Sequence, residues 1–176
     1  MNSQDNTKKI ILAVPKGRML KEAVPILKRA GIEPEPAFFE LSERRLCFSS
    51  NHKSIDIIRV RSFDVATFLA YGAAHIAIAG SDVLEEFNHL EIYAPVDLRI
   101  GKCRMVVAEK QDTLSLSEHR QLSHLRVATK YPNTTKRYFQ RKGVQVDCIK
   151  LNGAMEIAPN LGLCRRIVDL VETGST

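Results

Sequence analysis

Short apolar runs alternate with amphipathic helical patterns along most of this 176-residue chain, and this alternation constrains the fold more than any other feature. Apolar runs at residues 10–14, 55–60 and 76–79 each end in a small or charged turn, and apolar residues at helical spacing follow each turn. The same order resumes at residues 126–130. Strands that alternate with helices favour largely parallel sheets. We therefore predict an α/β protein.

The alternation breaks near Pro95, where residues 93–100 lose their periodicity. We interpret this stretch as a crossover between two lobes. Residues 1–95 are predicted to form lobe I, residues 96–165 lobe II, and residues 166–176 a segment that returns to lobe I. The ligand is expected between the lobes.

Two turns of lobe I that follow predicted strands have the composition of ligand sites. Lys16, Gly17 and Arg18 place two cations and a glycine at a helix N-terminus, an arrangement that suits an anion. Ordinary solvated loop charges are the alternative interpretation of both cations. Residues 80–82, Gly-Ser-Asp, form the second turn, and simple helix capping is its alternative explanation.

The end of the chain has the pattern of a phosphate-binding loop. An apolar run at residues 167–171 contains Asp169, and the turn that follows consists of Thr173, Gly174, Ser175 and Thr176. Gly174 permits a positive φ, so the neighbouring N–H and hydroxyl groups can converge on a phosphate. Asp169 is expected to accept hydrogen bonds from sugar hydroxyls beside that phosphate. The alternative is a polar turn at a loose terminus.

Composition narrows the classes of function. The net charge is +6, but the cations are spread along the chain and Trp is absent, so small phosphorylated substrates fit the charge as well as nucleic acid does. The four cysteines and five histidines are scattered, and we predict neither a zinc site nor a disulfide framework. The run at residues 10–14 is too short for a signal-peptide core or a membrane span, and we expect a cytoplasmic protein.

Four motifs and the terminal loop together carry a resemblance to a known family. The motifs are AVPKGR at residues 13–18, IAGSDVL at 78–84, RVATKYPN at 126–133 and NGAMEIAP at 152–159. In this order, over roughly residues 10–176, they resemble the ATP phosphoribosyltransferase family, and the chain length resembles its short form. The resemblance implies a two-lobed fold similar to type II periplasmic binding proteins, with an inter-lobe cleft.

The resemblance also implies a reaction and its participants. A phosphoribosyl group would pass from phosphoribosyl pyrophosphate to N1 of ATP with release of pyrophosphate, the first step of histidine biosynthesis. Mg²⁺ is expected to be held by the substrate phosphates, with no metal site on the protein. The expected partners are further copies of the chain and a regulatory subunit similar to histidyl-tRNA synthetase.

The site residues that the resemblance implies are carried over motif by motif. Lys16, Gly17 and Arg18 would line the nucleotide side. Asp169 and the terminal turn would line the phosphoribosyl side, with Glu156 between the two. Glu156 and Asp169 are the catalytic candidates, for contacts to ribose hydroxyls or to Mg²⁺.

Two further expectations follow from the same comparison of motifs. The family continues for another helical segment beyond the terminal loop, so the chain is expected to be a truncated or incompletely represented enzyme. A module of the same two-lobed fold that binds a small molecule without catalysis is the alternative function.

Overall fold

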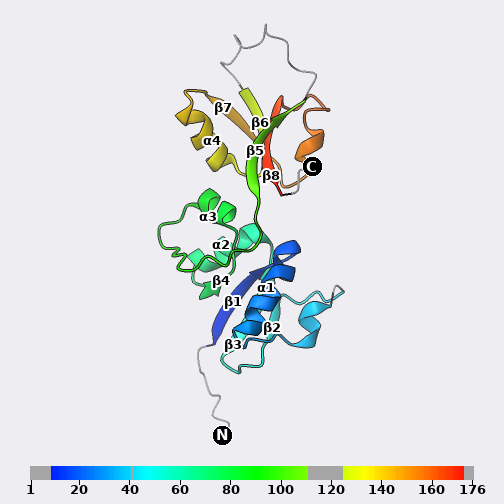
Figure 1. Ribbon diagram of the computed structural model, residues 1–176, viewed down its shortest axis with the longest axis vertical. Coiled ribbons are helices and arrows are strands. Elements are labelled where there is room, and N and C mark those ends of the chain that lie inside the picture. The colour runs from blue at the N-terminus through cyan, green and yellow to red at the C-terminus, as the bar shows by residue number, and fades with distance from the viewer. Residues whose placement is uncertain (1–8, 41, 111–124, 173–176) are drawn as a thin grey trace. The chain divides into compact units, whose positions relative to one another are not determined.

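The computed structural model describes residues 9–40, 42–110 and 125–172. The chain divides into two compact units, Met1–Gly101 and Lys102–Thr176 (Figure 1). Each unit contains a four-stranded sheet in which most neighbouring strands are parallel, which confirms the predicted α/β class. The division lies after Gly101, not near residue 95, because Leu98 and Ile100 pack against the core of the first unit.

The first unit is built on a sheet with the strand order β2-β3-β1-β4. Its elements are β1 (Ile10–Pro15), α1 (Arg18–Arg29), the 3-10 helix η1 (Pro36–Phe39), β2 (Cys47–Ser49), β3 (Ile55–Val60), α2 (Ser62–Ala70), β4 (Ile76–Ala77) and α3 (Ser81–Phe87). β1 pairs in parallel with both β3 and β4, whereas β2 runs antiparallel to β3. The central strand β1 therefore has neighbours on both sides.

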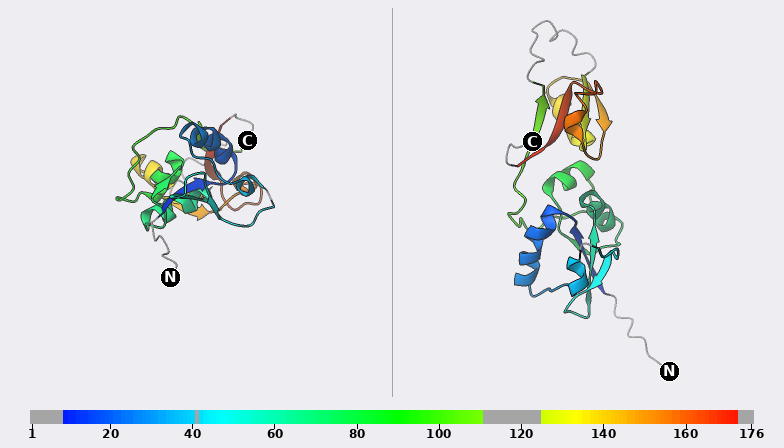
Figure 2. Two further views of the ribbon diagram at one scale, coloured as in Figure 1. Left: turned by 90° about the horizontal axis from the view of Figure 1, so that it is seen from below. Right: turned by 90° about the vertical axis from the view of Figure 1, so that its right-hand side faces the viewer.

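Helices cover both faces of this sheet because β1 is apolar on both faces. Leu12 and Val14 lie in one core cluster with Ala23 of α1. Ala13, which points to the opposite face, lies in a second cluster with Val65 of α2. The two helices thus pack on opposite faces, as the right-hand view of Figure 2 shows. A strand buried on both faces reads as a continuous apolar run, which is the pattern of residues 10–14.

The segment between α1 and β3 differs from the structure that its apolar residues predict. Leu46 and Phe48 stand two residues apart, which by itself predicts a strand pair over residues 38–50 with both side chains on one face. Only Cys47–Ser49 is a strand, and Pro36–Phe39 is a 3-10 helix that begins with proline. Phe48 is buried, whereas Leu46 is half exposed.

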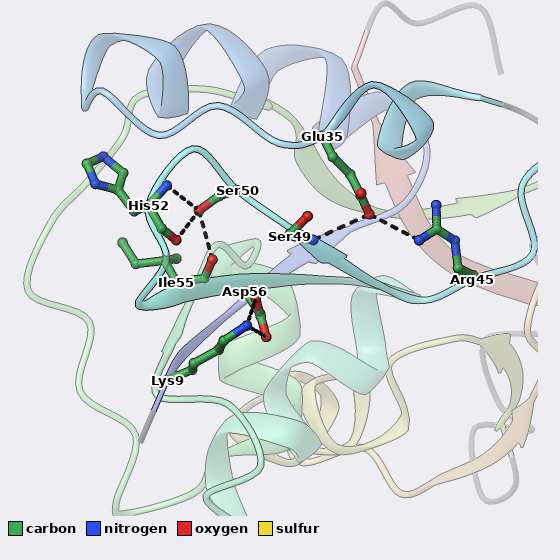
Figure 3. Close-up of polar contacts among 8 residues, drawn as sticks. All are labelled: Lys9, Glu35, Arg45, Ser49, Ser50, His52, Ile55 and Asp56. Atoms are coloured by element: carbon green, nitrogen blue, oxygen red, sulfur yellow. Dashed lines mark hydrogen bonds and ion pairs between the residues drawn. The ribbon is translucent and has the colours of Figure 1, made fainter. Parts of the chain in front are cut away.

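Polar contacts lie within this segment and between the strands beside it (Figure 3). The Glu35 carboxylate accepts hydrogen bonds from Arg45 Nη1 at 3.2 Å and from the Ser49 backbone N–H at 3.4 Å. On the neighbouring strand, Lys9 Nζ lies 3.0 Å from the Asp56 carboxylate. All of these pairs are partly exposed, so they orient the loop more than they stabilise the fold.

The second unit contains a sheet with the strand order β5-β8-β6-β7. Its described elements are β5 (Arg104–Glu109), β6 (Leu125–Thr129), α4 (Pro132–Arg141), β7 (Val146–Lys150), the 3-10 helix η5 (Met155–Ile157) and β8 (Arg166–Val171). β6 pairs in parallel with β7 and β8, and β5 closes the edge antiparallel to β8. α4 packs on one face with Phe139, and η5 lies at the other, where Ala158 is buried.

The prediction for residues 166–176 is wrong for the part that the structure describes. Instead of returning to lobe I, residues 166–171 form β8, an interior strand of the second sheet. The physical reason is the apolar run itself, because Val168 is buried with Phe139 and Ile167 packs with Ala158 on the opposite face. Both faces of the strand are therefore covered within the second unit.

A buried arginine holds η1 against β3. Arg59 is 7% exposed, and its guanidinium donates to the backbone carbonyls of Phe38 and, at 3.1 Å, Glu43. It also lies over the ring of Phe48, 5.0 Å from the centroid. Arg59 is thus a structural cation of this unit.

We predict that Arg59→Met destabilises the protein, because the Phe38 and Glu43 carbonyls lose their donor. The expected loss is about 2–6 kcal/mol of unfolding free energy, the sum of two unsatisfied acceptors. Urea unfolding followed by circular dichroism measures it. Arg44→Met, at an exposed position nearby, is the matched control and should change stability by less than about 0.5 kcal/mol. Equal stability of the two variants would contradict this role.

The Glu43 carboxylate provides a prediction about pH. The backbone N–H of Arg45, at 2.9 Å, and its guanidinium, at 3.0 Å, hold the pKa of Glu43 below its ordinary 4.5. Because the folded pKa is lowered, the interaction stabilises at neutral pH and is lost as the pH falls through that pKa. NMR titration should give a midpoint below 4.5 that rises in Arg45→Met but not in Arg44→Met. A midpoint unchanged by Arg45→Met would show that the side chain contributes nothing.

Candidate functional site

The carboxyl edge of the first sheet is the first half of the candidate site. Parallel pairing aligns Pro15 at the end of β1 with Val60 at the end of β3. From there α1 leaves to one face of the sheet and α2 to the other. Ligands of open α/β sheets bind where neighbouring connections diverge in this way. The geometry therefore points to the two turns that follow these strands.

The turn after β1 contains the three predicted residues Lys16, Gly17 and Arg18, all exposed. The Lys16 backbone N–H donates to the Val60 carbonyl at 2.7 Å, which extends the pairing by one residue. Gly17 has φ 87° and precedes the first residue of α1. An added Cβ there would meet nothing within 4 Å, so the backbone conformation, not lack of space, favours glycine.

Arg61 is a third cation at this edge, and the sequence analysis did not include it among the site residues. It follows β3 directly, is exposed, and lies beside Lys16 because Pro15 and Val60 are paired. Its backbone carbonyl caps α2 by accepting from the Asp64 N–H at 2.9 Å, which leaves the position of its side chain unconstrained by the cap. The available signal was an arginine placed directly between a buried strand and a helix.

The turn at residues 80–82 lies at the same edge, since Ile78, just after β4, donates its N–H to the Ala13 carbonyl. The Gly80 carbonyl accepts from Val83 and Leu84, which closes the first turn of α3. An added Cβ at Gly80 would collide with the Asp82 carboxylate. Gly80 is the N-cap of α3 and no side-chain hydrogen bond caps this helix, so the alternative of helix capping by Ser81 or Asp82 is wrong.

The second unit contains the two predicted acids, Asp169 on β8 and Glu156 on η5. Asp169 is half buried on β8, and its Oδ1 accepts from the Leu170 N–H at 2.8 Å. Strand alternation puts Asp169 on the same face as Ile167, the face on which η5 packs. Glu156 is an exposed residue of η5. The structure therefore places both acids on one face of the second sheet.

The predicted phosphate turn, residues 173–176, lies outside the described residues. β8 ends at Val171, parallel to β6. The carboxyl end of a parallel strand is the edge at which open α/β sheets bind ligands.

The described residues were also compared with the requirements of a metal site and of a membrane-spanning helix. Within residues 9–40, 42–110 and 125–172, no three His, Cys, Asp or Glu side chains gather closely enough to hold a metal ion. None of the helices in the described part of the chain is long and apolar enough to cross a membrane.

Comparisons with known proteins identify the family. A family model described as "HisG: ATP phosphoribosyltransferase" matches residues 61–176, more than half of the chain. An ATP phosphoribosyltransferase of Paramagnetospirillum magneticum is 60% identical over 176 residues, which are 100% of this chain and 79% of the relative. One from Rhodospirillum rubrum is 57% identical over 99% of this chain and 77% of its own length.

A solved structure agrees with this assignment. The chain is similar to one in an ATP phosphoribosyl transferase (HisG:HisZ) complex from Thermotoga maritima, with a TM-score of 0.76 and 36% identity. The similarity covers 94% of this chain and 75% of the solved chain. The chain therefore belongs to the ATP phosphoribosyltransferase family, whose reaction, the transfer of a phosphoribosyl group to ATP, is the first step of histidine biosynthesis.

Proposed function

We propose that the carboxyl edge of the first sheet binds the phosphates of ATP through Lys16, Arg18 and the additional cation Arg61. The observation that carries this proposal is the pairing of Pro15 with Val60, which brings two exposed cation-bearing turns side by side at a point where helices diverge. ATP carries several negative charges, and the positive Gly17 φ presents the start of α1 to a ligand. Gly17 is thus assigned a backbone role.

The second half of the proposal concerns phosphoribosyl pyrophosphate. Thr173, Gly174, Ser175 and Thr176 are assigned to its 5′-phosphate, and Asp169 to its ribose hydroxyls. Support comes from β8, which carries Asp169 on one strand with the turn that follows it. Glu156 is assigned to the same side because η5 packs against β8. Residues of one sheet edge would then hold the phosphate and sugar of one substrate.

The chemistry requires alignment more than a protein nucleophile. N1 of the adenine forms a bond to C1 of the ribose while the bond from C1 to pyrophosphate breaks, and positive charge develops on the sugar as it does in glycoside hydrolysis. Asp169, by accepting from ribose hydroxyls, would stabilise that charge as it develops. Mg²⁺ bound to the substrate phosphates would supply neutralisation of the leaving pyrophosphate.

Partners and location complete the proposal. The similar solved chain is part of a HisG:HisZ complex, which supports a regulatory partner of the HisZ kind for this chain. We also propose self-association and a cytoplasmic location, where both substrates are made. Size-exclusion chromatography with light scattering, with and without such a partner, tests the assembly.

We predict that Lys16→Gln and Arg61→Gln each weaken ATP binding. Loss of a hydrogen bond to a charged group costs about 1.5–3 kcal/mol, equivalent to roughly 10- to 100-fold in dissociation constant. Isothermal titration calorimetry with each substrate separately should show little change for phosphoribosyl pyrophosphate. Lys21→Gln, at an exposed position of α1, is the matched control. ATP affinity that is unaffected in both variants would exclude this edge as the nucleotide side.

We predict that Asp169→Asn lowers turnover more than it lowers phosphoribosyl-pyrophosphate affinity. The amide retains an oxygen for the Leu170 N–H but lacks the charge that matters as the sugar becomes cationic. Pyrophosphate release measures turnover, and calorimetry measures affinity. Asp147→Asn, at an exposed position of β7, should leave both unchanged. A fall in affinity equal to the fall in turnover would reduce Asp169 to a binding residue.

A further inference from the structure

Glu22 joins the start of α1 to the point where the chain leaves the first unit. Its Oε1 lies 3.8 Å from Arg18 Nε, one helical turn earlier. Its Oε2 accepts the Gly101 backbone N–H at 2.8 Å, a contact across 79 residues of sequence. One carboxylate therefore faces both a proposed ATP-binding cation and the last residue of the first unit.

The segment before the second unit is shaped to reach Glu22. Arg99 and Gly101 have φ 57° and 64°, so two left-handed residues flank Ile100, whose side chain packs against the first core. An added Cβ at Gly101 would collide with the sulfur of Met19, the neighbour of Arg18. The connection is thus seated directly on the first turns of α1.

We propose that Glu22 is a positioning residue that couples ATP binding at Arg18 to the hydrogen bond between the Gly101 N–H and the Glu22 carboxylate. The distances differ in kind: 2.8 Å is a hydrogen bond, whereas 3.8 Å is only a charge contact. ATP phosphates offer the Arg18 guanidinium a stronger anionic partner. When the guanidinium turns to them, the Glu22 carboxylate keeps its full charge for the Gly101 N–H, and the bond becomes stronger.

The coupling has a reciprocal consequence. If bound ATP strengthens the hydrogen bond from the Gly101 N–H to Glu22 by some factor, then formation of that hydrogen bond must raise the affinity for ATP by the same factor. The Gly101 backbone, where the chain leaves the first unit, would therefore be bound most strongly to α1 when ATP is bound. This inference rests on the proposed ATP side and goes beyond it by naming a residue that touches no substrate.

Amide hydrogen exchange of the full chain, resolved by NMR with and without Mg²⁺ and ATP, tests the coupling. The Gly101 amide should exchange about tenfold more slowly when ATP is bound, beyond any slowing of the Gly31 amide. Gly31 lies just after the far end of α1 and bonds to Lys28, so it reports general stabilisation alone.

Variants separate the charge of Glu22 from its hydrogen bond. Glu22→Gln keeps an acceptor for the Gly101 N–H but should abolish the ATP-dependent slowing of Gly101 amide exchange. Arg18→Gln should abolish the same slowing, because it removes the cation that responds to ATP. Glu33→Gln, at an exposed carboxylate of the same unit, is the control and should behave as the unmodified protein. Persistence of the full effect in Glu22→Gln, or equal slowing at Gly101 and Gly31, overturns the inference.

The same samples separate this inference from the proposed function. ATP affinity that does not depend on Lys16 or Arg61 overturns the proposed nucleotide side and the coupling with it. ATP affinity that does depend on them, with Gly101 exchange unaffected by ATP, overturns the coupling alone. Calorimetry on Glu22→Gln should show the reciprocal loss, a fall in ATP affinity by the same factor, about tenfold, as the lost slowing of Gly101 exchange.

Discussion

The parallel pairing of β1 with β3 is the constraint on which the rest of the first unit depends. Parallel strands deliver their carboxyl ends to the same edge, so Lys16 and Arg61 become neighbours although 44 other residues separate them. The pairing requires a crossover between β1 and β3, which contains α1, and the parallel pairing of β4 with β1 places α2 in a second connection, between β3 and β4. α1 and α2 take opposite faces, and open α/β sheets bind ligands where connections diverge in this way.

The second sheet also contains parallel strands whose carboxyl ends lie at one edge, with different side chains. β8 lies between β5 and β6, so the strand that carries Asp169 is supported on both sides, and one face packs against η5. Lys16, Arg18 and Arg61 follow strands of the first sheet, and Asp169 lies near the end of β8 in the second. The proposed function assigns these cations to polyphosphate and this acid to the sugar that becomes positively charged.

Two arginines near the end of β3 show how burial separates structure from function. Arg59 and Arg61 are the same residue type two positions apart, so strand alternation alone treats them alike. Arg59 is 7% exposed, and its guanidinium donates hydrogen bonds to backbone carbonyls in and just after η1. Arg61 lies beyond the strand, exposed at the edge. The distinction depends on what covers each side chain, which no local pattern records.

Sequence patterns determined the class of fold and the place of the turn that the proposed nucleotide side uses. Apolar runs such as residues 10–14 require burial on two faces, and the turns after them must lie at a sheet edge, so Lys16, Gly17 and Arg18 were predicted with their place. Local periodicity also predicted that residues 167–171 form a strand, because that pattern depends only on neighbouring residues.

Only the tertiary structure decided which sheet receives a strand and which distant residues meet. Residues 166–171 join the second sheet because the pairing partners of β8 are β5 and β6, and hydrogen bonds between strands carry no sequence signature of their own. The Glu22 bond to Gly101 and the placement of Arg61 beside Lys16 have the same origin. Such contacts arise when the folded chain brings distant segments together, whereas sequence periodicity reports only which face of a segment is buried.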